Sequence, residues 1–469
     1  MSPAALIEKA VESKDTNGSI VKGSAVLHRH LHYQPHRVVR ASGSNLWLDN
    51  GQKVFDSTGG AAVACLGHCN ERVKKAVMRQ MNEVSYCHSL FFSTSSAEAL
   101  ATELTRSTDG HMTKAFIVSS GSEAMEAALK LARQFHLEKH PPQPQRTRFI
   151  ARRESYHGTT LGALSVGGHL ARRALFEPML IPKMSWVSPC NAYRGKYKGE
   201  SDREYVARLA QELDDEFTRV GSDTVCAFVA EPVVGAALGC VPAVAGYFAA
   251  MKKVCDKHGA LLILDEVMCG MGRTGTLHAW QQEGIVPDLQ TIGKALGGGY
   301  APVAGLLINQ RVVDVLDKGT GAFAHGQTYQ GHPVACAAAL EVQRIVREDR
   351  LLENVKAMGK KLEAGLKDRL ETHPHVGNIR GRGLFWGIEI VEDKATKKPF
   401  DPKESIAMGL HEKGMMPKYG ISLYPGAGTV DGKCGDHVLL APAFNVSEAD
   451  IDFVVDMAAR VVEDFFAEY

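Results

Sequence analysis

One lysine in this chain of 469 residues is distinguished by its neighbours. Lys294 follows an apolar run at residues 289–292 and precedes three consecutive glycines at 297–299. Most lysines are solvated at the surface, but a lysine at the end of a buried strand is desolvated, which favours its neutral amine. A neutral amine can attack a carbonyl carbon and form a Schiff base. This segment therefore predicts a nucleophilic lysine, with an ordinary surface lysine as the alternative.

Two acids, Asp265 and Glu266, end a second apolar run at residues 261–264. A carboxylate at this place could face a heteroaromatic nitrogen, bind a metal ion or cap the next helix. No second carboxylate or histidine is spaced to complete a metal site, so no metal is expected. The other two interpretations stay open on this segment alone.

A turn of small residues follows a third apolar run, at residues 115–118, and contains Ser120, Gly121 and Ser122. Free backbone N–H groups at the start of a helix favour an anion, so the turn is a candidate phosphate site. It is not a P-loop, because no Gly-Lys-Ser/Thr follows. A serine that only caps the helix is the plainer interpretation.

A fourth turn, at residues 155–160, follows the apolar run 148–151 and contains Tyr156, His157 and Gly158. A tyrosine ring next to a glycine could lie against a flat ligand. An exposed turn without a ligand is the alternative, and this segment alone does not decide between them.

These four features share a position, because each lies at the end of a predicted strand. Helices are predicted between the strands by apolar periodicity, at residues 71–84, 96–106, 123–137, 204–217 and 247–257. Alternating strands and helices favour a mostly parallel sheet covered on both faces. The carboxyl ends of parallel strands meet at one edge, where ligands bind. We therefore expect the four features to form one site.

The domain organisation is expected to be an α/β fold with a smaller second domain. Residues 71–332 form the large domain, and residues 333–469 form a C-terminal α+β domain. Residues 1–70, with a short predicted strand pair, are assigned to the small domain. A leucine-rich stripe at residues 351–370 predicts one long helix that docks on a neighbouring domain.

Composition and charge exclude several classes of protein. The chain is 45% hydrophobic and 23% charged, with a formal net charge of +1, so neither nucleic acid nor an acidic membrane is an expected partner. Its ten cysteines follow no metal or disulfide pattern, which suits a reducing compartment. Residues 1–19 carry no targeting signal and no apolar stretch reaches the ~18 residues of a membrane helix, so a cytoplasmic location is expected.

Taken together, these segments resemble the class III aminotransferases, which belong to fold type I of the pyridoxal 5′-phosphate (PLP) enzymes. The resemblance runs in order from about residue 40 to the C-terminus. The matching motifs are Ser-Gly-Ser-Glu-Ala at 120–124, Tyr-His-Gly at 156–158, Glu-Pro-Val at 231–233, Asp-Glu-Val at 265–267, Gly-Arg-Thr-Gly at 272–275, Gly-Lys at 293–294 and Gly-Gln-Thr-Tyr-Gln-Gly-His-Pro at 326–333. Each motif is weak alone, and the set is specific.

The resemblance implies a PLP cofactor and a role for each residue. Lys294 would carry the cofactor as an aldimine and act as general acid and base. Asp265 would keep the pyridine nitrogen protonated, so that the ring is an electron sink. Tyr156 would stack on that ring, opposite Val267. The other expected cofactor contacts are Ser120, Gly121, Ser122, His157, Gly158, Glu231 and, from the partner subunit of a homodimer with shared active sites, Thr328.

Departures from the family pattern narrow the expected substrate. Ornithine- and GABA-type members carry a glutamate and a carboxylate-binding arginine at positions that hold Ala236 and Leu439 here. The mobile arginine of amine–pyruvate relatives is replaced by Gly432. Such a site suits a bulky or non-alpha amine. The expected substrate-pocket residues are Ala62, in place of a tryptophan, with Phe91, Phe92 and Lys433; Lys433 or Arg382 is the candidate cation for an acceptor carboxylate.

The expected activity is transfer of an amino group from an amine or amino-acid donor to a keto-acid or aldehyde acceptor, by a ping-pong mechanism. An aminomutase, racemase, decarboxylase or lyase on the same scaffold is the first alternative. A non-catalytic interaction protein with the same fold is a remote one, because no DNA-binding module is attached and Lys294 and Asp265 are intact.

Overall fold

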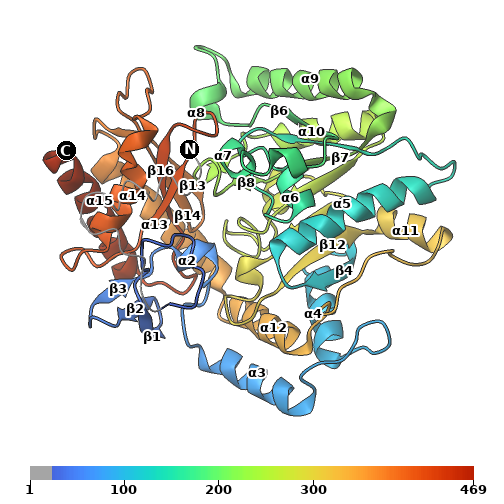
Figure 1. Ribbon diagram of the computed structural model, residues 1–469, viewed down its shortest axis with the longest axis horizontal. Coiled ribbons are helices and arrows are strands. Elements are labelled where there is room, and N and C mark those ends of the chain that lie inside the picture. Colours follow the sequence, from blue (N-terminus) through green and yellow to red (C-terminus); the bar gives the residue numbers. More distant parts are fainter. Residues whose placement is uncertain (1–23) are drawn as a thin grey trace.

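The computed structural model describes residues 24–469 (Figure 1). The segment in which we expect no targeting signal, residues 1–19, lies outside this range. A central seven-stranded sheet has the order β4-β12-β11-β10-β7-β5-β6. Its strands are β4 (Met112–Val118), β5 (Arg148–Arg152), β6 (Met184–Val187), β7 (Val225–Ala230), β10 (Leu261–Asp265), β11 (Leu289–Ile292) and β12 (Ala304–Asn309).

The sheet is mostly parallel, as predicted. The β6, β5, β7, β10 and β11 strands run in one direction. The β12 strand, which the sequence analysis missed, runs antiparallel to both β11 and β4. Since β12 lies between those two strands, β4 points in the same direction as the parallel set. The carboxyl ends of all the predicted strands therefore meet at one edge.

Helices cover both faces of this sheet because its strands are apolar on both faces. Along β10, Leu261 and Ile263 pack on the side of α5 (Gly121–Glu138), and Leu262 and Leu264 pack on the side of α9 (Asp202–Val220) and α10 (Tyr247–Lys257). This alternation follows from the two-residue period of a strand. The α5 face also receives α6 (Leu161–Val166) and α11 (Gln310–Lys318).

A second sheet lies on the other side of the molecule (Figure 1). It is antiparallel, with the order β13-β14-β16-β15. Its strands are β13 (Val376–Arg382), β14 (Phe385–Ile390), β15 (Tyr424–Ala427) and β16 (Asp436–Leu440), and its helices are α13 (Leu351–Leu370), α14 (Ile406–Gly414) and α15 (Glu448–Glu468). The long helix predicted at residues 351–370 is present as α13, which packs on α15 and β13 of this same region.

The N-terminal strands join this second region. They are β1 (Val38–Ser42), β2 (Asn45–Leu48) and β3 (Lys53–Phe55). The Phe55 backbone N–H donates to the Gly420 carbonyl at 2.7 Å, and Ser422 N–H donates to the Phe55 carbonyl at 3.0 Å. Residues more than 360 positions apart in the chain are thereby held side by side.

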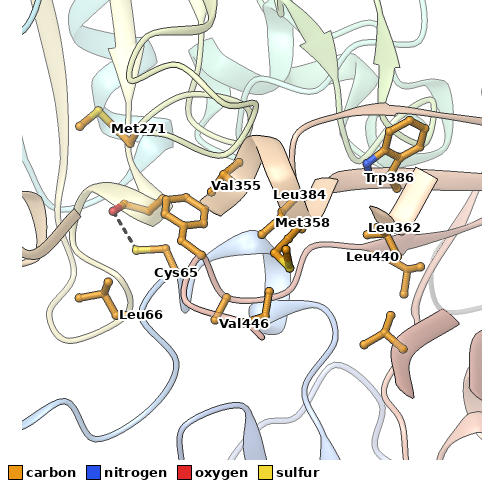
Figure 2. Packing of buried hydrophobic residues seen from close by; sticks show 14 of the residues in the cluster. Cys65, Leu66, Met271, Val355, Met358, Leu362, Leu384, Trp386, Leu440 and Val446 are labelled. Carbon is orange, nitrogen blue, oxygen red and sulfur yellow. Dashed lines mark hydrogen bonds between the residues drawn. The ribbon is translucent and has the colours of Figure 1, made fainter. Parts of the chain in front are cut away.

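Helix α12 (Pro333–Glu348) joins the two regions. It packs on α3 (Glu71–Glu83) and α4 (Ser95–Arg106), beside the large sheet, and α13 continues from it toward the second sheet. One apolar core crosses this junction (Figure 2). In that core the Cys65 thiol donates to the Ala295 carbonyl at 3.4 Å, one residue after Lys294.

Composition led to expectations about the cysteines, about metal ions and about membrane helices. All ten cysteines are free thiols, and most are buried. Within residues 24–469, no three His, Cys, Asp or Glu side chains are grouped so that they could hold a metal ion. No helix in that range is long and apolar enough to span a membrane.

Candidate active site

A cavity of about 400 Å³ opens at the edge where the strands of the large sheet end. The structure brings all four predicted features to it. Its lining includes Ser119, Ser120, Gly121 and Ser122 after β4, Tyr156, His157 and Gly158 after β5, Glu231 after β7, Asp265 and Val267 after β10, and Lys294 after β11.

Lys294 sits at a strained point of the backbone. Its φ is +48°, a left-handed value that costs free energy for any residue other than glycine. Burial lowers the pKa of its amine, while the nearby carboxylates of Asp265 and Glu231 work in the opposite direction. The amine is thus closer to its neutral, nucleophilic form than that of a surface lysine.

Asp265 is a buried carboxylate held from several directions. His157 Nδ1 lies 2.7 Å from Oδ2, and Oδ1 accepts the Val267 N–H and the Thr291 hydroxyl, each at 3.0 Å. Burial acts to raise the pKa of Asp265, but the hydrogen bond and charge of His157 and the bonds from Val267 and Thr291 outweigh it, so the pKa is lowered. The cavity therefore contains a fixed negative charge.

The second acid of the pair points the other way, as alternation along an extended chain requires. Glu266 accepts the backbone N–H groups of Ala279 at 2.6 Å and Trp280 at 2.7 Å, and the side-chain amide of Gln290 at 2.9 Å. Burial raises its pKa to about 8. Glu266 thus ties the segment after β10 to the domain core, and only Asp265 of the two acids lines the cavity.

The turn after β4 is shaped as a cradle for an anion. Ser120 caps α5 by accepting the Glu123 N–H at 3.2 Å, and Gly121 and Ser122 are the first residues of the helix, where backbone N–H groups have no carbonyl partner within the helix. A Cβ on Gly121 would lie 2.8 Å from Val267 Cγ1, so only glycine fits there. This is the place where a phosphate would be bound.

The turn after β5 is fixed against the same cradle. Gly158 has a φ of +131°, and a Cβ on it would lie 2.5 Å from Ser122 Oγ, which itself accepts the Thr159 N–H at 3.0 Å. Glu231 accepts the Tyr156 N–H at 3.1 Å and the Gly235 N–H at 3.2 Å. Glu231 thus orients the turn that carries the Tyr156 ring.

Sequence reasoning missed one cation at this site. The guanidinium carbon of Arg172, on the short helix α7 (Leu170–Arg173), lies 4.5 Å from the centre of the Tyr156 ring. An arginine pair sixteen residues beyond Tyr156 was the only available signal, and nothing in the local sequence distinguishes Arg172 from Arg173.

The structure does not bring every predicted residue to the cavity. Phe91, Phe92 and Thr328 are exposed and do not line it within this chain. Lys433 is exposed on the loop at 428–435 and does not line it either. The interpretation of Arg382 as an acceptor-binding cation is wrong, because its guanidinium donates to Glu283 at 2.5 Å and to the Ala243 carbonyl at 3.0 Å.

Three of the four positions that depart from the family pattern, all except Gly432, gather in one apolar cluster, which we call the apolar wall. It contains buried Ala62, Met268 and Leu439, with Ala236 and Tyr424 packed against it. Met268 also lines the cavity. The wall therefore borders the cavity through Met268.

The side chains of this cavity fit PLP. Lys294 supplies an amine, Asp265 a carboxylate for a pyridinium nitrogen, and the start of α5 an anion cradle of the right chemistry. His157 Nε2 is buried without a hydrogen-bond partner among the described residues, which leaves one polar atom at the site still to be satisfied.

Comparison with known proteins agrees with this fit. The family described as Aminotransferase class-III matches residues 27–462. An aminotransferase of Gibberella zeae is 56% identical over 92% of this chain and 84% of its own length. The vanillin aminotransferase of Capsicum frutescens is 35% identical over 92% of both chains, and the chloroplastic gamma aminobutyrate transaminase 3 of Solanum lycopersicum is 34% identical over 92% and 81%.

Solved structures extend the agreement to the fold. The omega transaminase of Pseudomonas jessenii, in complex with PMP, superimposes with a TM-score of 0.87 at 32% identity and covers 98% of this chain and 97% of its own. Together with the family match over nearly the whole chain, this makes the protein an enzyme of the transaminase type that uses PLP, and the chain belongs to the class III aminotransferases.

Proposed function

We propose that this enzyme moves an amino group from a bulky or non-alpha amine to a keto-acid or aldehyde acceptor, by a ping-pong mechanism. The observation that carries the substrate class is the apolar wall. Ala62, Ala236 and Leu439 lie in it together, and Met268 of the same cluster lines the cavity. A donor would then be selected by apolar shape, where each buried methylene contributes roughly 0.8 kcal/mol.

The residues of the cavity have separate tasks in this proposal. When bound, PLP supplies an electron sink for the reacting carbon. Asp265 would keep a proton on the ring nitrogen, because the lowered pKa of its carboxyl favours the charged form of that carboxyl. Lys294 Nζ would hold the cofactor covalently and would serve as the general base and acid that takes up and returns the substrate proton.

The other cavity residues position the ring. Tyr156 and Val267 would contact its two faces, and Gly121 and Ser122 would bind the phosphate through their N–H groups. Glu231 holds the Tyr156 turn through the two N–H groups that it accepts. Ser120, His157 and Gly158 complete the cofactor contacts.

A homodimer in the cytoplasm completes the proposal. Thr328 is exposed, and its carbonyl accepts the Tyr86 hydroxyl at 3.0 Å in a segment away from the cavity of its own chain, which suits a contribution to the partner's phosphate site. Phe91 and Phe92 are large apolar residues left exposed in the single chain. A partner subunit would cover them and could bring them close to substrate.

A donor comparison tests the proposed substrate class. With pyruvate as acceptor, we expect kcat/KM for hexylamine and benzylamine to equal or exceed that for 6-aminohexanoate and 4-(aminomethyl)benzoate. A carboxylated donor preferred by about a hundredfold would show a dedicated carboxylate site and contradict the proposal. Formation of the aldehyde from the donor together with alanine from pyruvate, both followed by mass spectrometry, separates a transaminase from an aminomutase, racemase, decarboxylase, lyase or non-catalytic protein.

A further inference from the structure

Arg172 is a half-buried cation beside the cavity that the chain itself leaves without an anion. Its guanidinium carbon lies 4.5 Å from the centre of the Tyr156 ring, and it forms no ion pair within residues 24–469. Its neighbour Arg173 is different: it donates to the carbonyls of Leu164, Ser165 and Gly167, and to Glu177. These hydrogen bonds fix the Arg173 side chain to the surrounding fold, whereas Arg172 forms none of them.

Arg172 is not itself a lining residue of the cavity, but it contacts one of them, Tyr156. Tyr156 lines the cavity, and the charge of Arg172 acts on the pKa values of Tyr156, His169 and Lys294. Its helix also abuts the loop at 428–435, because a Cβ on Gly432 would lie 3.1 Å from Leu170 Cβ. Arg172 therefore stands between the cavity and this loop.

Other cations near the site are less suited to hold an anion. Arg382 is paired with Glu283, and Lys433 is exposed on its loop. Arg29 also acts on the pKa of Tyr156, but its side chain is exposed and solvated. Only Arg172 among these four combines partial burial, an aromatic face beneath it and the absence of a carboxylate partner.

We propose that Arg172 binds the carboxylate of the keto-acid acceptor and so determines specificity in the second half-reaction. This rests on the proposed function. A guanidinium stacked on an aromatic ring keeps its N–H edges free, and those edges match a carboxylate with two parallel charge-assisted hydrogen bonds. The amine donor then needs no carboxylate, because the apolar wall selects it.

The test compares the PLP-loaded variants Arg172→Met and Arg172→Lys with the matched control Arg29→Met. The donor is held constant, and the acceptor is either pyruvate or butanal, which has no carboxylate. In Arg172→Met we expect kcat/KM for pyruvate to fall about a hundredfold, with butanal unchanged. In Arg172→Lys the loss should be smaller, because an ammonium cannot form the paired bonds. Arg29→Met should behave as the wild type with both acceptors.

A binding measurement separates this proposal from the proposed function. Propionate, which cannot be aminated, should bind the loaded wild-type enzyme in calorimetry and lose that binding in Arg172→Met, while the absorbance of the cofactor stays the same. Failure of every amine to react would reject the proposed function, and the propionate result would still decide the role of Arg172.

Three outcomes would overturn the inference. Equal losses with pyruvate and butanal, or a changed cofactor absorbance, would mean that Arg172 acts only through Tyr156. Loss of propionate binding in Arg29→Met alone would assign the anion to Arg29. Unchanged pyruvate kinetics and propionate binding in Arg172→Met would mean that no carboxylate is held there.

Discussion

The cofactor end of the cavity and the apolar wall beside it are built in opposite ways. At the cofactor end, charged groups are fixed by several hydrogen bonds each, as Asp265 is by His157, Val267 and Thr291. In the wall, the side chains of Ala62, Met268 and Leu439 pack against other apolar side chains. A fixed polar network performs one reaction with high precision, whereas a wall of this kind changes selectivity with every change in side-chain volume. Substitutions at the two places should therefore have effects of very different size.

The largest effect is expected at Lys294. Lys294→Ala removes the only lysine that lines the cavity of the described chain, so covalent attachment of PLP and turnover should both be lost. Borohydride treatment of the wild type followed by peptide mapping should find the adduct on Lys294. Lys433→Ala is the matched control, since this lysine is exposed and should be dispensable for attachment. An adduct on another lysine would refute the assignment.

Asp265→Asn should retain PLP but lower kcat by about 10²–10³, because an amide cannot hold the charge on the ring nitrogen. The neighbouring acid provides the control. Glu266 faces the core and burial raises its pKa to about 8, so Glu266→Gln should affect thermal stability far more than kcat. Equal losses of kcat in Asp265→Asn and Glu266→Gln would show that the two carboxyl groups matter equally for turnover, and would contradict the separate role of Asp265.

The same contrast explains what could be predicted from sequence. Lys294 and Asp265 were predictable because each ends an apolar run, and the order of strands and helices then brings strand ends to one edge. The antiparallel β12 strand was missed because its place in the sheet, between β11 and β4, depends on pairing with β4, which is distant in sequence.

Tertiary contacts account for the remaining misses. Arg382 was misassigned because a local reading cannot reveal its pairing with Glu283, ninety-nine residues away. Arg172 was missed because the local sequence does not show that Arg173 turns to the Leu164, Ser165 and Gly167 carbonyls while Arg172 turns to the Tyr156 ring. The sequence identified Ala62, Ala236 and Leu439 as departures from the family pattern, but only the fold brings them into one cluster.

The smallest effect is expected in the apolar wall, at Met268, which is buried and lines the cavity. Met268→Ala removes apolar contact with the donor without touching the polar network, so kcat/KM for a long amine such as hexylamine should fall about tenfold, which corresponds to roughly two methylene contacts. A short amine such as ethylamine does not reach the wall and should be little affected, and pyruvate kinetics should be unchanged.

Met251→Ala is the matched control, because Met251 is fully buried on α10 in the core on the far side of β10. This variant should lower the melting temperature and leave the ratio of kcat/KM for the long amine to that for the short amine as in the wild type. If Met268→Ala lowered both amines equally, the wall would be supporting Lys294 and Asp265 rather than selecting the donor, and the two regions would act as one.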